Sequence, residues 1–225
     1  MRQRHRFEHL ISWLSSDVQT ARLPSPAFAI EERPEEIWKH KVFCILSSQF
    51  NAERAAWIAG EIVDQIPFFD PEFSTAKVEE ACFEFLSSPD VRYRFPRARA
   101  RQISLSRFPF LQIKDCYHEF IQSFSNEERA RAEIVKLYPG VGIKQASMFL
   151  RNIGASRTLS VIDAHILYYL SVCHDWNVSN LTQRRYEQAE SLMRNDAGCR
   201  GLDLNVFDTI VWTAARSMKK AERYV

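Results

Sequence analysis

Apolar residues recur at helical intervals, three or four positions apart, over most of this chain. One long region, residues 35–66, shows the pattern twice, and small polar residues at 47–54 interrupt it, which predicts two helices with a break between them. The same spacing predicts further helices at about 77–86, 97–104, 114–124, 125–137, 143–153 and 205–220. Ser125 and Glu128 have the spacing of a capping box. Strand-like alternation is scarce, so the predicted fold class is all-α.

Residues 138–142, Tyr-Pro-Gly-Val-Gly, separate two of these predicted helices. Glycine permits a positive φ and the close approach of another backbone. We therefore expect the backbone amides of Gly140, Val141 and Gly142 to face outward and to bind an anion such as a DNA phosphate. An ordinary corner between two helices would contain the same glycines, so the hairpin alone leaves both interpretations open.

Lys144 and Asp163 add candidate chemistry to this hairpin. Lys144 follows Gly142 by two residues, and Asp163 follows nineteen residues later. A lysine at the start of a helix lies at the positive end of the helix dipole, which together with partial burial favours the neutral amine that a nucleophile needs. Asp163 is predicted to be the N-cap of the next helix, where its carboxylate is fixed in orientation and can assist proton transfer. Singly, the two residues could be a phosphate contact and a helix cap, whereas their occurrence together favours catalysis.

Composition and charge narrow the class of protein. Of the 225 residues, 46% are hydrophobic and 26% are charged, which is enough apolar side chain for a compact core. The formal net charge is only +2, so overall charge does not by itself indicate nucleic acid. Six arginines nevertheless form a cluster that is either a solvated helix face or a phosphate-binding surface: Arg92, Arg94, Arg97, Arg99, Arg101 and Arg107.

The cysteines and the termini bear on metal binding and on location. The five cysteines are scattered without a CxxC pair, which argues against a zinc site or an iron–sulfur cluster with local spacing. No apolar run approaches the length of a membrane span, and the basic N-terminus lacks a cleavage-like site. We therefore expect a cytoplasmic protein without membrane association. Three prolines in residues 23–34 predict a connection after a short N-terminal helix.

The segment 137–166 resembles the helix-hairpin-helix/Gly-Pro-Asp superfamily of DNA glycosylases. Its sequence KQASMFLRNIG, followed by IDAHIL, is similar above all to the bacterial and archaeal 8-oxoguanine DNA glycosylase/AP lyases of the second Ogg type. The resemblance implies two helical lobes with the hairpin motif, about 127–154, at the cleft between them. It implies a glycosylase domain at 35–225, with 1–34 as an N-terminal helix and linker packing on the core. His165, two residues after the aspartate, matches a contact to phosphate or sugar.

The resemblance also implies roles for side chains outside the hairpin. Gln49, Asn51 and Arg54 lie in a segment that resembles the part of the family that meets the duplex and the orphaned partner base. Asp208 and Trp212 are four residues apart, hence on one helical face, and they match positions that shape the base pocket. Residues 92–103 of the arginine cluster resemble the family's arginine-rich stretch, which favours the DNA-binding interpretation of the cluster.

The implied activity is that of a bifunctional DNA glycosylase/AP lyase that excises an oxidised purine, first of all 8-oxoguanine, from double-stranded DNA. Lys144 would attack C1′ of the extruded nucleotide with the help of Asp163, and the resulting Schiff base would permit β-elimination. No metal or organic cofactor is required, although the hairpin could hold a structural monovalent cation. We expect a monomer acting at the nucleoid of a bacterium or archaeon.

Two alternatives to this activity stay open. One is the same chemistry on a different modified base, for example in foreign DNA. It is motivated by Val225, because the similar relatives end in a lysine that reaches the damaged base. The other is a non-catalytic helix-hairpin-helix DNA-binding module, against which the joint occurrence of Lys144 and Asp163 argues.

Overall fold

The computed structural model of the chain describes residues 2–19 and 33–222. All regular structure in these ranges is helical, which confirms the all-α class. The elements in chain order are α1 Arg2–Gln19, α2 Pro34–Leu46, α3 Ala52–Gln65, α4 Thr75–Ser87, α5 Pro96–Ile113, the 3-10 turn η1 Lys114–Cys116, α6 Tyr117–Gln122, α7 Glu127–Leu137, α8 Ile143–Asn152, α9 Ala164–His174, α10 Gln183–Cys199 and α11 Leu204–Glu222. Residues 23–32 of the predicted connection, and Val225, lie outside the described residues.

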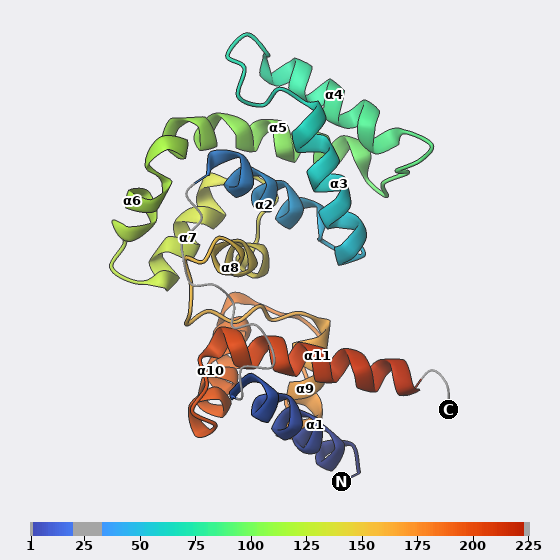
Figure 1. The fold of residues 1–225 in the computed structure, drawn as a ribbon, viewed down its shortest axis with the longest axis vertical. Coiled ribbons are helices and arrows are strands. Elements are labelled where there is room, and N and C mark those ends of the chain that lie inside the picture. Colours follow the sequence, from blue (N-terminus) through green and yellow to red (C-terminus); the bar gives the residue numbers. More distant parts are fainter. Residues whose placement is uncertain (1, 20–32, 223–225) are drawn as a thin grey trace. The chain divides into compact units, whose positions relative to one another are not determined.

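The described chain forms two compact units, whose helices Figure 1 labels. The terminal unit consists of residues 2–19 and 156–222 and contains α1, α9, α10 and α11. The central unit consists of residues 33–155 and contains α2 to α8. Each unit buries its own set of apolar side chains. None of the described helices is long and apolar enough to cross a membrane.

Helix α2 is the core helix of the central unit. It packs against α3, α5 and α8, and Figure 1 shows it lying among them. Its apolar residues face more than one side, because a helix surrounded by neighbours needs a broad apolar surface. The indole of Trp38, for example, is fully buried between the rings of Phe68 and Phe110, at centroid distances of 5.2 and 5.0 Å. This packing provides the rigid base on which the hairpin helix α8 rests.

Two predicted helices of the central unit differ in extent from those observed. The helix predicted at 97–104 is α5, which continues to Ile113 through Pro109 because a single proline removes only one backbone hydrogen bond from an otherwise well-packed helix. The helix predicted at 114–124 is divided into η1 and the short α6. The division follows from the backbone of Ile113 and Cys116, whose φ values of −124° and −133° leave the helical region.

The capping box predicted at Ser125 and Glu128 is wrong. The N-cap of α7 is Asn126, whose Oδ1 accepts a hydrogen bond of 2.8 Å from the backbone N–H of Arg129. Asn126 has the extended backbone that an N-cap adopts, with φ −162° and ψ 169°, so Ser125 lies one position too early to cap.

Helix α11 is central to the terminal unit, where it packs against α9, α1 and α10. Phe7 and Ile11 of α1 are fully buried, and the Phe7 ring lies 5.4 and 5.5 Å from the rings of Tyr168 and Tyr169 on α9. Before α9 comes an irregular stretch, 156–162, which leads directly to Asp163. Helix α10 has no counterpart among the predicted helices, because most of its residues are polar.

Candidate active site

The glycine hairpin joins α7 to α8 within the central unit. Gly140 has a φ of +78°, a conformation that glycine adopts without strain. A Cβ at this position would lie 2.3 Å from Cδ of Gln102 on α5, so the end of the Gln102 side chain would have to shift to admit one. Gly142 instead has φ −90° and ψ −178°, an extended conformation open to any residue. The sequence argument for positive φ therefore applies to Gly140 and not to Gly142.

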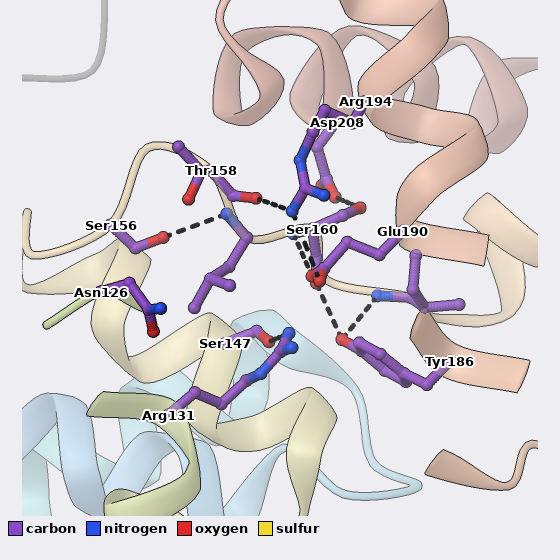
Figure 2. A network of polar contacts seen from close by, with 12 residues as sticks. Asn126, Arg131, Ser147, Ser156, Thr158, Ser160, Tyr186, Glu190, Arg194 and Asp208 are labelled. Carbon is purple, nitrogen blue, oxygen red and sulfur yellow. Dashed lines mark hydrogen bonds and ion pairs between the residues drawn. The ribbon is translucent and has the colours of Figure 1, made fainter. Parts of the chain in front are cut away.

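The amides of the hairpin are only partly available to a ligand. The N–H of Val141 donates to the carbonyl oxygen of Tyr138 at 3.2 Å, and the Val141 side chain is buried, which corrects the expectation that all three hairpin amides are unpaired. Gly142 is the N-cap of α8 and has no side chain to cap it. The first-turn amides of α8 thus lack an intrahelical partner, as an anion-binding helix start requires. The buried guanidinium of Arg131 holds the two hairpin helices together by donating to Oγ of Ser147 at 3.1 Å (Figure 2).

Lys144 is the second residue of α8 and is half-buried. Its charge acts on the thiol of Cys44 on the core helix α2. Burial raises the pKa of the Cys44 thiol to about 12, while Lys41, Arg151 and Lys144 act in the opposite direction. Cys44 is therefore a neutral, buried thiol, and Lys144 is the amine at this position that solvent and a ligand can approach.

Asp163 is the N-cap of α9, as predicted. Its Oδ1 accepts hydrogen bonds from the backbone N–H groups of His165 and Ile166, at 2.7 and 3.0 Å. Its Oδ2 accepts a third, of 3.1 Å, from the indole Nε1 of Trp212 on α11. The two oxygens thus have separate partners, and the plane of the carboxylate is fixed by both the helix that it caps and the helix packed beside it.

The surroundings of Asp163 are rich in cations. His165 lies edge-on to Trp212 at a centroid distance of 5.4 Å. Burial lowers the pKa of His165, Asp163 raises it, and Lys219 and Arg216 of α11 lower it further, which favours a neutral imidazole at neutral pH. Lys219 also donates to the carbonyl oxygen of Ala164 at 3.0 Å.

Asp208 lies one helical turn before Trp212 on α11 and is buried. Its Oδ2 accepts from Oγ of Ser160 at 2.5 Å and from the backbone N–H of Val161 at 2.8 Å (Figure 2). Asp208 and Trp212 therefore both bind the stretch of chain that ends at Asp163. The predicted part of Asp208 in a base pocket stays a prediction.

Gln49, Asn51 and Arg54 surround the turn between α2 and α3. Gln49 is exposed and has a φ of +57°, which is strained for a residue with a side chain. Asn51 is the N-cap of α3, where its Oδ1 accepts from the backbone N–H of Arg54 at 2.8 Å. The guanidinium of Arg54 donates to the carbonyl oxygens of Asp90 and Val91, at 3.2 and 2.6 Å. The three side chains lie on one exposed turn, and two of them already support the local backbone.

The arginine cluster divides into exposed and buried members. The exposed ones are Arg92, Arg94, Arg97 and Arg101, and Arg99 is half-buried. Arg107 is buried and donates to the carbonyl oxygens of Phe68 and Asp70, at 2.5 and 2.6 Å. The prediction that Arg107 belongs to a DNA-binding face is therefore wrong, because a guanidinium that satisfies two buried carbonyls is not available to phosphate.

Two further side chains, Tyr186 and Glu190 of α10, bind the backbone of Ser160 and were not predicted (Figure 2). The signal that could have found them is the helical spacing of Tyr186, Ala189 and Met193 within a polar stretch.

The described residues contain no group of three or more His, Cys, Asp or Glu side chains placed to hold a metal ion.

The class of protein follows from these local settings. A glycine hairpin between two helices, a lysine in the first turn after it and an aspartate capping the next helix define an all-helical protein of the helix-hairpin-helix class. Residues 26–200 match the family described as 8-oxoguanine DNA glycosylase. The chain belongs to this family.

Curated relatives agree with the family match. The chain is 33% identical to an 8-oxoguanine DNA glycosylase/AP lyase of Korarchaeum cryptofilum, over 82% of this chain and of that protein. It is 34% identical to a protein of the same description from Methanocaldococcus jannaschii, over 79% of each. The family is thus one of DNA glycosylase/AP lyases, which makes this chain a member of an enzyme family.

Solved structures share the fold. The 8-oxoguanine DNA glycosylase of M. jannaschii has a TM-score of 0.71 and 28% identity, with 94% of each chain covered. A glycosylase/lyase of the same organism, in complex with 15mer DNA containing 8-oxoguanine, has a TM-score of 0.68, again at 28% identity, over 94% of this chain and 96% of that one. The 8-oxoguanine DNA glycosylase of Thermotoga maritima, at 23% identity and a TM-score of 0.71 over 92% of this chain and 95% of that one, agrees in fold.

Proposed function

We propose that this chain is a bifunctional DNA glycosylase/AP lyase that removes 8-oxoguanine from double-stranded DNA through a Schiff base on Lys144. The observation that carries the proposal is the local setting of the two candidate residues. Lys144 lies in an uncapped first turn after the hairpin, and Asp163 has each carboxylate oxygen held by its own donors. Family membership supports the reaction class, and the M. jannaschii complex with 8-oxoguanine DNA supports the substrate.

The proposed reaction begins with extrusion of the damaged nucleotide, because its C1′ is inaccessible inside the duplex. The neutral amine of Lys144 forms a bond to C1′ as the bond between C1′ and the base breaks, and the base leaves with a proton. As the carboxylate, Asp163 stabilises the positive charge that develops on the sugar; it then accepts the proton that the new bond to C1′ releases from the lysine nitrogen and passes that proton to the departing base. After the sugar ring opens, the resulting Schiff base allows loss of a proton from C2′ and departure of the 3′ phosphate. These steps use side chains of the protein alone, and the hairpin carbonyls could hold a structural monovalent cation.

The remaining candidate residues are proposed to hold the DNA. The amides of Gly140 and Gly142, the first turn of α8 and the His165 side chain would contact phosphate or sugar. The exposed turn with Gln49, Asn51 and Arg54 would meet the duplex beside the extruded base. Trp212 would form one wall of the base pocket with its half-buried ring.

The proposal is tested by borohydride reduction in the presence of a duplex with 8-oxoguanine opposite cytosine. Wild-type protein should form a covalent adduct with the DNA, and Lys144→Gln should form none, since an amide cannot give a Schiff base. Lys136→Gln is the matched control, because Lys136 is an exposed lysine on the other hairpin helix, paired with Glu133. An adduct with Lys144→Gln would refute the assignment of the nucleophile.

The same assay distinguishes the alternatives. Duplexes with other modified bases in place of 8-oxoguanine identify the base that is removed. Adduct formation with only one of these other bases would mean that this base is the substrate and that the proposed chemistry still holds. Binding without any adduct, on 8-oxoguanine, an abasic site or the other lesions, would identify a non-catalytic DNA-binding module. Light scattering of the protein with its DNA tests the expected monomer.

A further inference from the structure

The stretch that leads to Asp163 forms no helix or strand, and it is buried apart from Arg157 and Thr158. Ser156, Leu159, Ser160, Val161 and Ile162 are all at least nine-tenths buried. Backbone N–H and C=O groups in such a place need partners, since each unpaired one would carry an appreciable cost. Regular structure does not supply these partners here, so side chains must.

The side chains that supply them come from α10 and α11. Ser160 is held at three points: its backbone N–H donates to Oε1 of Glu190 at 2.9 Å, its Oγ donates to Oδ2 of Asp208 at 2.5 Å, and its carbonyl oxygen accepts from the hydroxyl of Tyr186 at 2.8 Å (Figure 2). Tyr186, Glu190 and Asp208 are here called the Ser160 clamp.

The clamp continues through the two residues that follow. The N–H of Val161 donates to the same Oδ2 of Asp208 at 2.8 Å, and the N–H of Ile162 donates to the hydroxyl of Tyr186 at 3.1 Å. Tyr186 therefore holds two points of the backbone, whereas Asp208 holds one backbone N–H and the hydroxyl of Ser160. The clamp residues are themselves only 2–3% exposed, so these bonds are shielded from competing water.

We propose that Tyr186, Glu190 and Asp208 are positioning residues for catalysis, which hold the backbone of residues 160–162 so that Asp163 is aimed correctly. The last clamped residue, Ile162, is bonded directly to Asp163, so a shift of the clamped backbone moves the carboxylate. Catalytic groups must be held within about 0.5 Å of their productive positions. Trp212 and the cap fix the carboxylate plane, whereas the clamp fixes where its Cα lies. This role rests on the proposed function of Asp163.

The assignment also gives Asp208 a definite part. Its Oδ2 is shared between two donors of the clamped stretch, and the side chain is buried. Asp208 thus acts on the reaction through Asp163, while Trp212, one turn later on the same helix, is half-buried and keeps part of its surface exposed.

Tyr186→Phe tests the proposal against Tyr169→Phe as its matched control. Both tyrosines are buried in the terminal unit, and both donate a hydroxyl hydrogen bond, Tyr186 to Ser160 and Tyr169 to Oδ2 of Asp196 at 2.6 Å. The Tyr186 hydroxyl bonds the stretch before Asp163, whereas the Tyr169 hydroxyl bonds a side chain of α10. The measurements are the single-turnover rate of borohydride-trapped adduct at saturating enzyme, the dissociation constant for a duplex with a tetrahydrofuran abasic analogue, and the melting temperature.

Tyr186→Phe should lower the single-turnover rate about tenfold and change the dissociation constant less than about twofold, because orientation and not binding is lost. Tyr169→Phe should lower the melting temperature comparably and keep the rate within about twofold of wild type. Equal rates for the two variants would overturn the proposal, as would a loss confined to DNA affinity.

Ser160→Ala keeps the test decisive if Tyr186→Phe does not fold. It removes only the bond from Oγ to Asp208, and it should lower the rate about threefold with unchanged affinity. A rate equal to wild type would count against the clamp. If wild-type protein forms no adduct at all, the proposed function fails, and the clamp fails with it. If wild type reacts and the variants react equally fast, the clamp alone is refuted.

Discussion

At the scale of single residues, the two oxygens of Asp163 have different partners, which makes its structural and catalytic roles separable. Oδ1 caps α9, and Oδ2 accepts from Trp212. An asparagine could still accept the two cap bonds through its amide oxygen, yet it would present an N–H group to the indole N–H and could not take up a proton. A cap of this kind is thus compatible with a function in proton transfer.

Asp163→Asn should leave the free energy of unfolding within about 1 kcal/mol of wild type, because asparagine caps helices as well as aspartate does. The single-turnover rate should fall by about 100-fold or more, the usual effect of losing a general base. Thermal melting, binding to the tetrahydrofuran duplex and borohydride trapping separate the two effects. A large fall in melting temperature with a proportionate loss of rate would show that Asp163 is only a cap.

The candidate site was predictable where its signal is local in sequence. The glycine hairpin just before Lys144 and the N-cap pattern at Asp163 are short signals, so the places of both residues at helix starts could be predicted, while their catalytic roles stay predictions. The contacts of Asp208 could not be: Ser160 lies 48 residues away in sequence, and no periodicity connects the two. Arg107 shows the same limit, because its partners Phe68 and Asp70 turn a residue of a basic cluster into a buried support.

At the scale of elements, the helices that bury a clear apolar stripe were predicted, among them α2, α3, α8, α9 and α11. Helix α10 was missed because only four apolar residues of its sequence are buried, and they are spaced among polar ones; the fifth buried residue is the charged Glu190. The N-cap predicted for α7 is one residue too early, because Ser125 and Asn126 are both residue types that cap helices and only the backbone conformation decides between them.

The backbone of the hairpin favours glycine at position 140. Gly140→Ala should lower the free energy of unfolding by about 1–2 kcal/mol through left-handed strain alone. The substitution should lower the free energy of unfolding further, because the new Cβ would lie 2.3 Å from Cδ of Gln102. The Gln102 side chain must then move, which disturbs its 2.7 Å hydrogen bond from Arg99. DNA affinity should fall with it, because the turn carries the proposed phosphate-binding amides. Denaturant unfolding and binding to the tetrahydrofuran duplex measure these effects.

Gly201→Ala is the control for the hairpin. Gly201 has a φ of +64° but nothing within 4 Å of an added Cβ, so it incurs the strain without the clash. Its stability loss should be smaller than that of Gly140→Ala, and its DNA affinity should be unchanged. Equal losses would mean that Gln102 gives way freely and that only the backbone conformation matters at Gly140.

At the scale of the whole molecule, the two ends of the chain build one unit. The family match ends at residue 200, before α11 begins, yet α11 carries both Asp208 and Trp212. The support of Asp163 therefore depends on a helix outside the matched range, with α1 packed against that helix. Comparisons limited to the hairpin block would miss the side chains that orient the carboxylate.

The stability of the molecule should also depend on pH through one buried amine. Lys41 of the core helix α2 is fully buried, and its Nζ lies 3.5 and 3.7 Å from the ring centroids of Tyr138 and Phe149, beneath the hairpin. Burial lowers the pKa of Lys41 well below its ordinary 10.5, against a smaller opposite effect of Cys44. The unfolded chain then binds the proton more readily, so this lysine costs stability below pH 10.5, and the cost grows as the pH falls until the folded-state pKa is passed.

Lys41→Met should therefore raise the melting temperature, and the gain should be larger at pH 7 than at pH 10, because methionine fills similar space without an ionisable group. Melting curves across this range measure it, with Lys39→Met on the same helix as a half-exposed control that should show no such trend. A lower melting temperature for Lys41→Met at pH 7 would mean that the amine is charged and held by the two rings. The hairpin would then rest on a cation–π contact, and the pH dependence of stability would have to come from elsewhere in the molecule.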